Sequence, residues 1–225
     1  MLELQLERLK RASMIDQLVV ATTINPLDDS IENLCSSIDV PCFRGSENDV
    51  LDRYYQAAKE YNAKYIVRLT GDDPLTDPEL IDRMIKKIKL KEYDAITNSL
   101  RPSYPEGLDV TVLKFIVLKE AWENAKMQSQ REHVTPYIFD SKSNFSVYHF
   151  QQKKDYSELR WTVDYEEDIQ FVEHVYNKLY LKNKKFSTED IYALLENTPS
   201  LKSLNSKFIR DAGLIESLKN DVEIK

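Results

Sequence analysis

Two adjacent carboxylates follow a short apolar segment in the run YIVRLTGDDPLTDPELI, residues 65–81. Asp72 and Asp73 come directly after Gly71, and a helix can begin at Asp77. This order places both carboxylates at the carboxyl end of a strand, where open α/β sheets hold their ligands. Mg²⁺ is commonly held by one or two carboxylates together with substrate phosphates. A strand-to-helix turn rich in Asp and Pro has the same composition without any ligand, so this motif alone leaves both interpretations open.

Strand-like and helix-like segments alternate through the first 93 residues. Short apolar runs are bounded by turn formers, and the segments between them repeat apolar residues at the 3.6-residue spacing of an amphipathic helix. After a first helix that ends near residue 12, strands are expected at 17–22, 40–45 and 65–71, and helices at 28–38, 48–61 and 78–90. This βαβ order predicts an α/β fold with a mostly parallel sheet and helices on both faces.

The pattern is less regular after residue 93. The segments AITNSL and LDVTVLKF flank a proline-rich turn. Strands are expected at 144–150 and 159–164, and helices at 121–125, at 131–139 with an interruption near Pro136, at 166–180 and at 188–196. The sequence contains no internal repeat and no low-complexity linker. We therefore expect one domain over residues 1–199, with residues 200–225 as a C-terminal helical extension of the same domain.

Composition narrows the classes of function. Hydrophobic residues make up 42% of the 225 residues and charged residues 31%, which predicts a folded core rather than disorder. The net charge is −7, and no basic cluster is interleaved with aromatic residues, which argues against nucleic acid as a partner. No apolar run approaches the ~18 residues of a membrane span. Cys35 and Cys42 lie outside any metal-binding spacing, so a reduced cytoplasmic protein is expected.

Six motifs in this order resemble the spore-coat polysaccharide cytidylyltransferase-like family, a relative of the acylneuraminate and 3-deoxy-manno-octulosonate cytidylyltransferases. They are VVATT, VPCFRGSENDVLDRYYQAAKEY, YIVRLTGDDPLTDPELID, YPEGLDVTVL, REHVTPYI and LRWTVDYEEDIQFV. The resemblance runs from about residue 2 to about residue 215. It implies a Rossmann-like nucleotidyltransferase fold, that of the nucleotide-diphospho-sugar transferases. It also implies that a sugar hydroxyl attacks the α-phosphate of CTP, forming a CMP-sugar and pyrophosphate for surface polysaccharide or glycan biosynthesis.

The resemblance also implies a set of site residues. Asp72 in TGDDP and Asp164 in WTVDYEED match the catalytic residues that hold Mg²⁺, while Asp73 either assists or caps the following helix. The positions implied for nucleotide binding are Arg44, Gly45, Ser46, Asp52, Arg53, Arg68 and Asp73. Those implied for sugar binding are Tyr104, Glu106, Gly107, Asp109, Arg131 and His133. The partners are then CTP and an acidic or amino sugar, and a homodimer is possible.

Several of these assignments have a structural alternative. Ser46 could begin a helix, and Asp52 with Arg53 could be solvated surface charges. Arg68, on an otherwise apolar strand, could be ion-paired instead of contacting a substrate. The Arg131–His133 segment could be a polar helix start with a local salt bridge.

One departure from the family concerns the N-terminus. The relatives open with a strand and a glycine-rich, basic loop that cradles the triphosphate, whereas this chain begins at the helix that follows. Without that central strand, the sheet should have a gap and expose strand edges. The chain is either truncated at an internal methionine or has lost its phosphate cradle; we favour truncation, and expect a poor catalyst as it stands. A metal-dependent glycosyltransferase and a non-catalytic subunit remain the alternative functions.

Overall fold

The computed structural model describes residues 1–224, so the last residue of the expected extension 200–225 lies outside the described residues. The strands are β1 (Val20–Thr23), β2 (Cys42–Gly45), β3 (Tyr65–Arg68), β4 (Ala95–Thr97), β5 (Thr111–Lys114) and β6 (Val147–His149). The α-helices are α1 (Leu2–Leu9), α2 (Asp29–Ser37), α3 (Val50–Glu60), α4 (Pro78–Lys91), α5 (Phe115–Asn124), α6 (Gln128–His133), α7 (Pro136–Phe139), α8 (Glu166–Leu179), α9 (Thr188–Asn197) and α10 (Ala212–Lys219). Two short 3₁₀ helices are η1 (Pro26–Asp28) and η2 (Pro199–Ser203). None of the helices described within residues 1–224 has both the length and the apolar character to cross a membrane.

The helices and strands expected from the sequence are present, with one exception. The strand expected at 159–164 is wrong: the segment forms only a single parallel bridge, between Arg160 and Glu106. Further along, the Val163 N–H donates to the carbonyl oxygen of Asp72 at 2.9 Å. The segment therefore divides its backbone hydrogen bonds between two different loops, which prevents a regular ladder with either of them.

The sheet is more mixed than the expected mostly parallel one. β3, β5, β4 and β6 form a four-stranded sheet in that order, in which β5 runs antiparallel to both of its neighbours and β4 pairs parallel with β6. The reversal between β4 and β5 is held by the side chain of Asn98. Its amide donates to the Leu108 carbonyl oxygen at 2.8 Å, and its oxygen accepts from the Val110 N–H at 2.7 Å.

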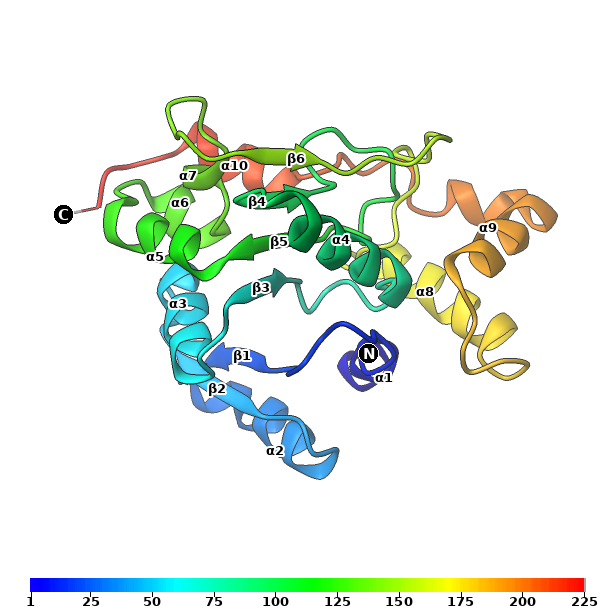
Figure 1. Cartoon of the computed structure of the whole chain (residues 1–225). Helices are drawn as coiled ribbons and strands as arrows, with labels where there is room; N and C mark the ends of the chain where they lie inside the picture. Colours follow the sequence, from blue (N-terminus) through cyan, green and yellow to red (C-terminus); the bar gives the residue numbers. More distant parts are fainter. Residues whose placement is uncertain (225) are drawn as a thin grey trace.

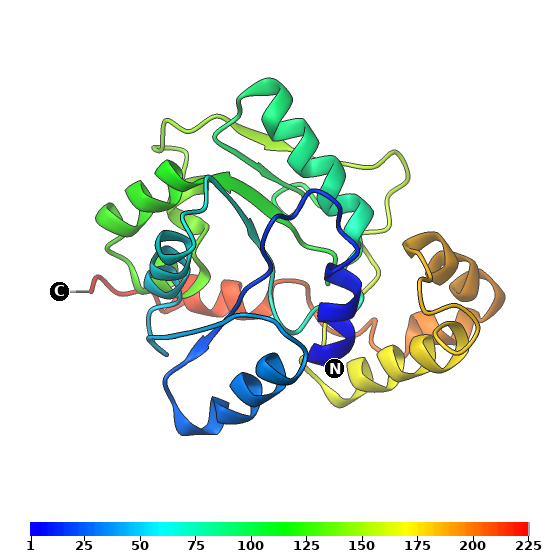
Figure 2. The same cartoon turned by 60° about the horizontal axis from the view of Figure 1, so that its bottom comes forward.

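Helices cover both faces of this sheet, as expected. Neighbouring residues of one strand enter different apolar cores: Ile96 and Val112 join a large cluster, whereas Ala95 and Leu113 join a second one. Because successive side chains of a strand point to opposite faces, the two clusters lie on opposite sides of the sheet. Helix α4 packs against β4 and β5, and α3 packs against α5 and α6. In Figure 2, α8 and α9 project at one side of the molecule, in yellow and orange.

The predicted gap in the sheet is present. β1 and β2 pair in parallel as a separate two-stranded sheet, and neither strand is hydrogen-bonded to the other four. Figure 1 shows β1 and β2 beside β3 with α2 on their outer side. A groove with a volume of about 670 Å³ lies between β1 and β3, and its lining includes Leu6, Ala58, Val67 and Ile85.

Gly107 in the turn before β5 is the glycine whose replacement should cost the most. Its φ is +97°, and a Cβ there would lie 2.5 Å from the carbonyl carbon of Trp161. We expect Gly107→Ala to lower the free energy of unfolding by about 3 kcal/mol or more, because both the backbone conformation and the space are unsuitable. Urea denaturation measures this change in the free energy of unfolding. The matched control is Gly213→Ala in α10, where a Cβ meets no atom within 4 Å; it should raise stability by up to ~1 kcal/mol. Equal stability of the two variants would contradict the prediction.

Candidate active site

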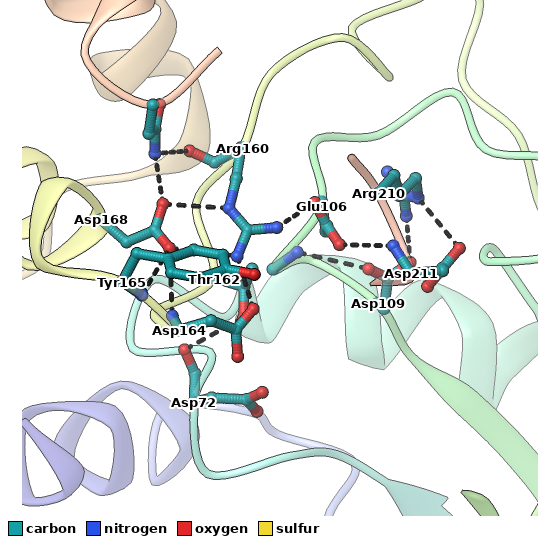
Figure 3. A network of polar contacts seen from close by, with 12 residues as sticks. Asp72, Glu106, Asp109, Arg160, Thr162, Asp164, Tyr165, Asp168, Arg210 and Asp211 are labelled. Carbon is teal, nitrogen blue, oxygen red and sulfur yellow. Dashed lines mark hydrogen bonds and ion pairs between the residues drawn. The ribbon is translucent and has the colours of Figure 1, made fainter. Parts of the chain in front are cut away.

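The loop after β3 and the segment before α8 meet at the end of the four-stranded sheet. The carbonyl oxygen of Asp72 accepts from the Val163 N–H at 2.9 Å and from the Thr162 hydroxyl at 3.4 Å. Asp164 follows directly, so two carboxylates distant in sequence lie at one site (Figure 3). This is the arrangement that the sequence predicts for a ligand site at the carboxyl end of a strand.

The two neighbouring aspartates of the loop have different environments. Oδ1 of Asp72 is buried and has no hydrogen-bond partner within residues 1–224. Asp73 is buried and accepts from the Thr70 hydroxyl at 2.7 Å. Burial, and then the charge of Asp72, raises the pKa of Asp73 well above its usual range. Asp73 does not cap the following helix, because Asp77 caps α4 by accepting from the first backbone N–H groups.

Asp164 is held by a buried arginine. Nη2 of Arg160 donates to Oδ2 of Asp164 at 2.5 Å, Nη1 to Glu106 at 2.7 Å and Nε to Asp168 at 3.0 Å. The Arg160 side chain is only 4% exposed, whereas that of Asp164 is 50% exposed. Burial would lower the pKa of Arg160, but the bonds to Asp168 and the charge of Glu106 raise it above its ordinary value. Arg160 therefore stays charged and fixes one oxygen of Asp164, whereas Oδ1 has no hydrogen bond within residues 1–224.

Residues 205–211, here called the closing segment, complete this network. Nδ2 of Asn205 donates to Asp168 Oδ1 at 2.8 Å and to the carbonyl oxygen of Arg160 at 3.0 Å. The ring of Phe208 stacks on Tyr165 with the ring centres 3.9 Å apart. The guanidinium of Arg160 lies 5.6 Å from both ring centres, within the range of a cation–π contact.

The closing segment also binds the turn before β5, where the sugar side is expected. Arg210 donates to Asp109 Oδ1 at 2.5 Å and to the carbonyl oxygen of Tyr104 at 3.1 Å. The backbone N–H of Asp211 donates to Glu106 Oε1 at 2.9 Å. Figure 3 shows the Arg210–Asp109 pair and the Arg160 cluster joined through Glu106. Glu106 and Asp109 therefore already have partners inside the protein.

The sequence reasoning missed Arg160, Asp168 and the closing segment. A signal was available for the first two, because Arg160 and Asp164 lie four residues apart, as do Asp164 and Asp168, and Arg160 adjoins apolar residues. The same argument, that a charge among apolar residues needs a partner, had singled out Arg68. Nothing comparable marks the closing segment in the sequence.

Among the nucleotide-side positions, Arg44 does not reach the Asp72 site. Its guanidinium donates to Asp29 at 2.6 Å and to Glu32 at 2.7 Å, both on α2, and to the carbonyl oxygens of Thr23 and Asn25. These contacts occupy the N–H donors of the guanidinium with groups of β1, α2 and the loop between them. Arg44 therefore ties α2 to the two-stranded sheet.

The residues around the start of α3 have mixed roles. Gly45 ends β2 and packs against the Arg53 side chain. Ser46 does not begin α3, whose N-cap is Asp49. Oδ1 of Asp52 accepts from the Trp122 indole N–H at 2.8 Å, so it is not a merely solvated charge.

Arg53 and Arg68 come closest to the nucleotide-side expectation. The Nε atoms of both are buried and have no hydrogen-bond partner within residues 1–224. Burial raises the pKa of Tyr54, and the charges of Arg68 and Arg53 partly oppose that rise, while the charge of Asp72 adds to it. Arg53, Arg68 and Asp72 therefore surround one tyrosine at the end of β3. No ion pair of the described residues involves Arg68.

The remaining sugar-side positions are engaged elsewhere. Tyr104 is 4% exposed. Arg131 on α6 forms a bidentate ion pair with Asp49, and its Nη1 donates to the carbonyl oxygen of Trp122 at 2.7 Å. His133 is 2.9 Å from the Ser217 hydroxyl on α10. The alternative of a polar helix start with a local salt bridge does not describe this segment either, because Arg131 and His133 lie in the last turn of α6 and Arg131 pairs with Asp49, outside that helix. Neither side chain forms a hydrogen bond or ion pair with Asp72 within residues 1–224.

The carboxyl of Asp109, whose side chain is 22% exposed, makes stability depend on pH. Burial raises its pKa to about 6, although the charge of Arg210 opposes the rise. The unfolded chain releases this proton near pH 4. The Asp109 contribution to stability is therefore fully present below about pH 4 and is lost as the pH rises to about 6, by on the order of 2 kcal/mol. In urea denaturation, the free energy of unfolding of Asp109→Asn minus that of wild type should therefore increase between pH 4 and pH 6. A difference that does not change with pH would contradict this assignment.

Two carboxylates at this site fit a magnesium ion. No group of three or more His, Cys, Asp and Glu side chains is arranged to hold a metal within the described part of the chain. Asp72 offers a buried oxygen that has no hydrogen-bond partner among the described residues, and Asp164 offers its second oxygen. One or two carboxylates with substrate phosphates are what Mg²⁺ typically uses, so the donor set suits an ion that arrives with a nucleotide.

Comparison with known proteins assigns the family. The chain is 39% identical over 213 residues to an uncharacterized protein, MJ1063, of Methanocaldococcus jannaschii, covering 91% of this chain and 83% of that protein. It is 31% identical to the spore coat polysaccharide biosynthesis protein SpsF of Bacillus subtilis, covering 82% of this chain and 76% of SpsF.

Two solved structures are also similar to this chain. A cytidylyltransferase from Leptospira borgpetersenii superposes with a TM-score of 0.85 at 31% identity, over 89% of this chain and 84% of that one. A CMP:2-keto-3-deoxy-manno-octonic acid synthetase complexed with CTP superposes with a TM-score of 0.58 at 11% identity, over 79% of this chain and 87% of that one. The latter likeness concerns the fold alone. It confirms the predicted α/β nucleotide-diphospho-sugar transferase fold.

The family model described as cytidylyltransferase matches residues 1–205. That match spans both candidate metal ligands and most of the Arg160 network. The resemblance read from the sequence is confirmed, and the chain belongs to the cytidylyltransferase family.

Proposed function

We propose that the chain transfers the cytidylyl group of CTP to a hydroxyl of a sugar. The hydroxyl oxygen forms a bond to the α-phosphorus, the bond from that phosphorus to the β-phosphate oxygen breaks, and pyrophosphate leaves. The hydroxyl proton passes to solvent, and no side chain is assigned as its base. Family membership supports this reaction. The observation that carries it is the buried, unpartnered oxygen of Asp72 beside Asp164.

The side chains have separate tasks in this proposal. Asp72 and Asp164 would hold Mg²⁺, which neutralises phosphate charge and makes the α-phosphorus easier to attack. Arg160 holds Asp164 through its Oδ2, and Oδ1 would be the oxygen that binds the ion. Arg53 and Arg68 supply positive charge at the end of β3, where a phosphate or the ribose would lie.

Calorimetric titration with CTP, with and without Mg²⁺, tests the nucleotide half of the proposal. We expect binding that requires Mg²⁺ and is weaker for UTP and ATP. Glu123→Gln on the surface of α5 is a control, because this side chain is 47% exposed and forms an ion pair with Lys119 on the same helix. Folded protein that releases no heat with any nucleotide would overturn the proposal and favour a non-catalytic subunit.

For the acceptor we propose an acidic or amino sugar used in a surface polysaccharide. The SpsF relative is described as a spore coat polysaccharide biosynthesis protein, which supports this class of pathway. A panel of acidic and amino sugars should reveal one that triggers pyrophosphate release from CTP. Transfer from a nucleotide sugar without pyrophosphate release would instead support a glycosyltransferase.

A further inference from the structure

The closing segment occupies the polar groups of the turn before β5, residues 104–109, here called the acceptor turn. Arg210 donates to Asp109 Oδ1 and to the carbonyl oxygen of Tyr104, and the backbone N–H of Asp211 donates to Glu106 Oε1 (Figure 3). Carboxylate and carbonyl oxygens are acceptors, and the hydroxyl groups of a sugar are donors. The closing segment therefore occupies oxygens that the hydroxyl groups of a sugar could use.

The chain is held firmly at Asn205 and more loosely beyond it. Asn205 is 2% exposed and donates two hydrogen bonds into the Arg160 network. By contrast, none of the eight residues of α10 (Ala212–Lys219) is buried. Two of its apolar side chains, Ile215 and Leu218, are 40% and 52% exposed. A segment that buries so little apolar surface can separate from the body of a protein without unfolding it.

Side-chain hydrogen bonds attach α10 and the residues after it to α6, which lies beside α10 (Figure 1). The N–H and the hydroxyl of Ser129 donate to Asp221 at 2.8 and 2.6 Å, and His133 lies 2.9 Å from the Ser217 hydroxyl. Such bonds stabilise a contact only modestly, because water can replace either partner. Asp211, at the start of α10, has a φ of +56°, which is unfavourable for a residue with a side chain. The weak attachment and this conformation both favour release.

We propose that residues 206–224 form a C-terminal lid over the acceptor turn. The lid turns about Asn205, and its opening releases Glu106 and Asp109 to the hydroxyl groups of an incoming sugar. Because those hydroxyl groups replace the donors of the lid, the sugar would stabilise the open state. The identity of the incoming molecule rests on the proposed function, whereas the opening does not. The match to the family model ends at residue 205, so family membership does not account for the lid.

Hydrogen–deuterium exchange of single amides measures the opening. The Asp211 N–H belongs to the lid, and the Ser129 N–H, which donates to Asp221, belongs to the body beneath it. Both should show the same protection and exchange at least about 100-fold faster than the Leu113 N–H of the paired strand β5. Exchange of all three amides at the same rate would mean that the lid leaves only when the whole protein unfolds, which overturns the proposal.

A disulfide between positions 127 and 223 can lock the lid. Met127 and Glu223 form an antiparallel bridge, flanked on both sides by backbone hydrogen bonds. A pair in this position has Cα atoms about 4.5 Å apart, which suits a disulfide. In the double variant Met127→Cys, Glu223→Cys, oxidation should slow exchange at Asp211 at least about tenfold relative to the same protein reduced. Peptide mass mapping checks that the disulfide joins these two positions. Equal exchange in the two forms overturns the proposal.

Asp221→Ala tests the attachment in the opposite direction. It removes both hydrogen bonds from Ser129 and should speed exchange at Asp211 at least about fivefold. Asp155→Ala is the matched control, because Asp155 accepts from the Ser157 N–H at 2.9 Å outside the lid, and it should leave this exchange unchanged. Unchanged exchange in Asp221→Ala would show that these bonds do not hold a lid, and also overturns the proposal.

Chemical labelling of Glu106 shows what the lid covers. A water-soluble carbodiimide with an amine converts accessible carboxyl groups to amides. Glu106, whose side chain is 12% exposed, should be labelled at least about tenfold more slowly in the oxidised double variant than in the reduced one. Glu196, 65% exposed, should be labelled equally in both. Equal labelling of Glu106 overturns the proposal.

The lid and the proposed function fail separately. No readout of the lid uses a nucleotide, so a chain without a lid could still bind CTP. A folded chain that binds no nucleotide would overturn the proposed function and leave the exchange and labelling results unchanged.

Discussion

Asp72→Asn should abolish the Mg²⁺-dependent part of CTP binding, lowering the affinity by about 10²-fold or more. The substitution keeps the shape of the side chain and removes the charge of an oxygen that is buried and has no hydrogen-bond partner within residues 1–224. Because that oxygen contributes no hydrogen bond to the fold, the free energy of unfolding should stay the same or rise slightly. Calorimetry with CTP and Mg²⁺ measures the first effect, and urea denaturation measures the second.

The double variant strengthens this test. If Asp72 and Asp164 hold one ion, Asp164→Asn should also remove the Mg²⁺-dependent binding, and combining the two changes should add little to either. Additive losses would mean that the carboxylates act separately, and an unchanged affinity in Asp72→Asn would exclude this residue as a ligand. Glu123→Gln, on the exposed surface of α5, should bind CTP as wild type does.

Arg160→Leu should cause the largest loss of stability, about 3–5 kcal/mol in the free energy of unfolding. The guanidinium is 4% exposed and pairs with Glu106, Asp164 and Asp168, so its removal leaves carboxylates facing one another in a buried space. Removing one partner of a buried charge cluster costs more than the cluster itself contributes, because the remaining charges lose their compensation.

Two further variants test this prediction. Lys154→Ala breaks an ion pair with Glu196 whose side chains are 66% and 65% exposed, and it should cost less than ~0.5 kcal/mol. Adding Asp168→Asn to Arg160→Leu should recover part of the lost stability, since it removes one of the uncompensated charges. A loss for Arg160→Leu no larger than that for Lys154→Ala would show that the network does not stabilise the fold.

The sequence predicted the local elements well, because their signals are local. Helix α4 was expected at 78–90 and spans Pro78–Lys91; its apolar spacing and the Asp77 cap are both contained in the segment itself. The direction in which the strands pair was harder to predict from the sequence. The antiparallel placement of β5 depends on a turn held by Asn98, whose partners Leu108 and Val110 lie ten or more residues away.

Part of the candidate site was also predictable from local signals. Asp72 and Asp164 lie in two of the family motifs, and the backbone hydrogen bond from the Val163 N–H to the Asp72 carbonyl oxygen joins the two segments. The roles of Arg44 and Arg131 were not predictable, since a basic residue in a matching motif can equally bind a carboxylate of its own protein, as Arg44 does with Asp29 on α2. Only the three-dimensional contacts distinguish these cases.

The closing segment has a consequence for the order of events during synthesis. Domains generally form from the N-terminal side as the chain leaves the ribosome. Arg160 and Asp168 emerge before Asn205, and Asp109 emerges about a hundred residues before its partner Arg210. The acidic groups of the site therefore gain their partners in the closing segment only after the C-terminal part of the chain has been synthesised. A nascent or proteolytically shortened product would contain both candidate metal ligands and still lack the contacts that complete the candidate site.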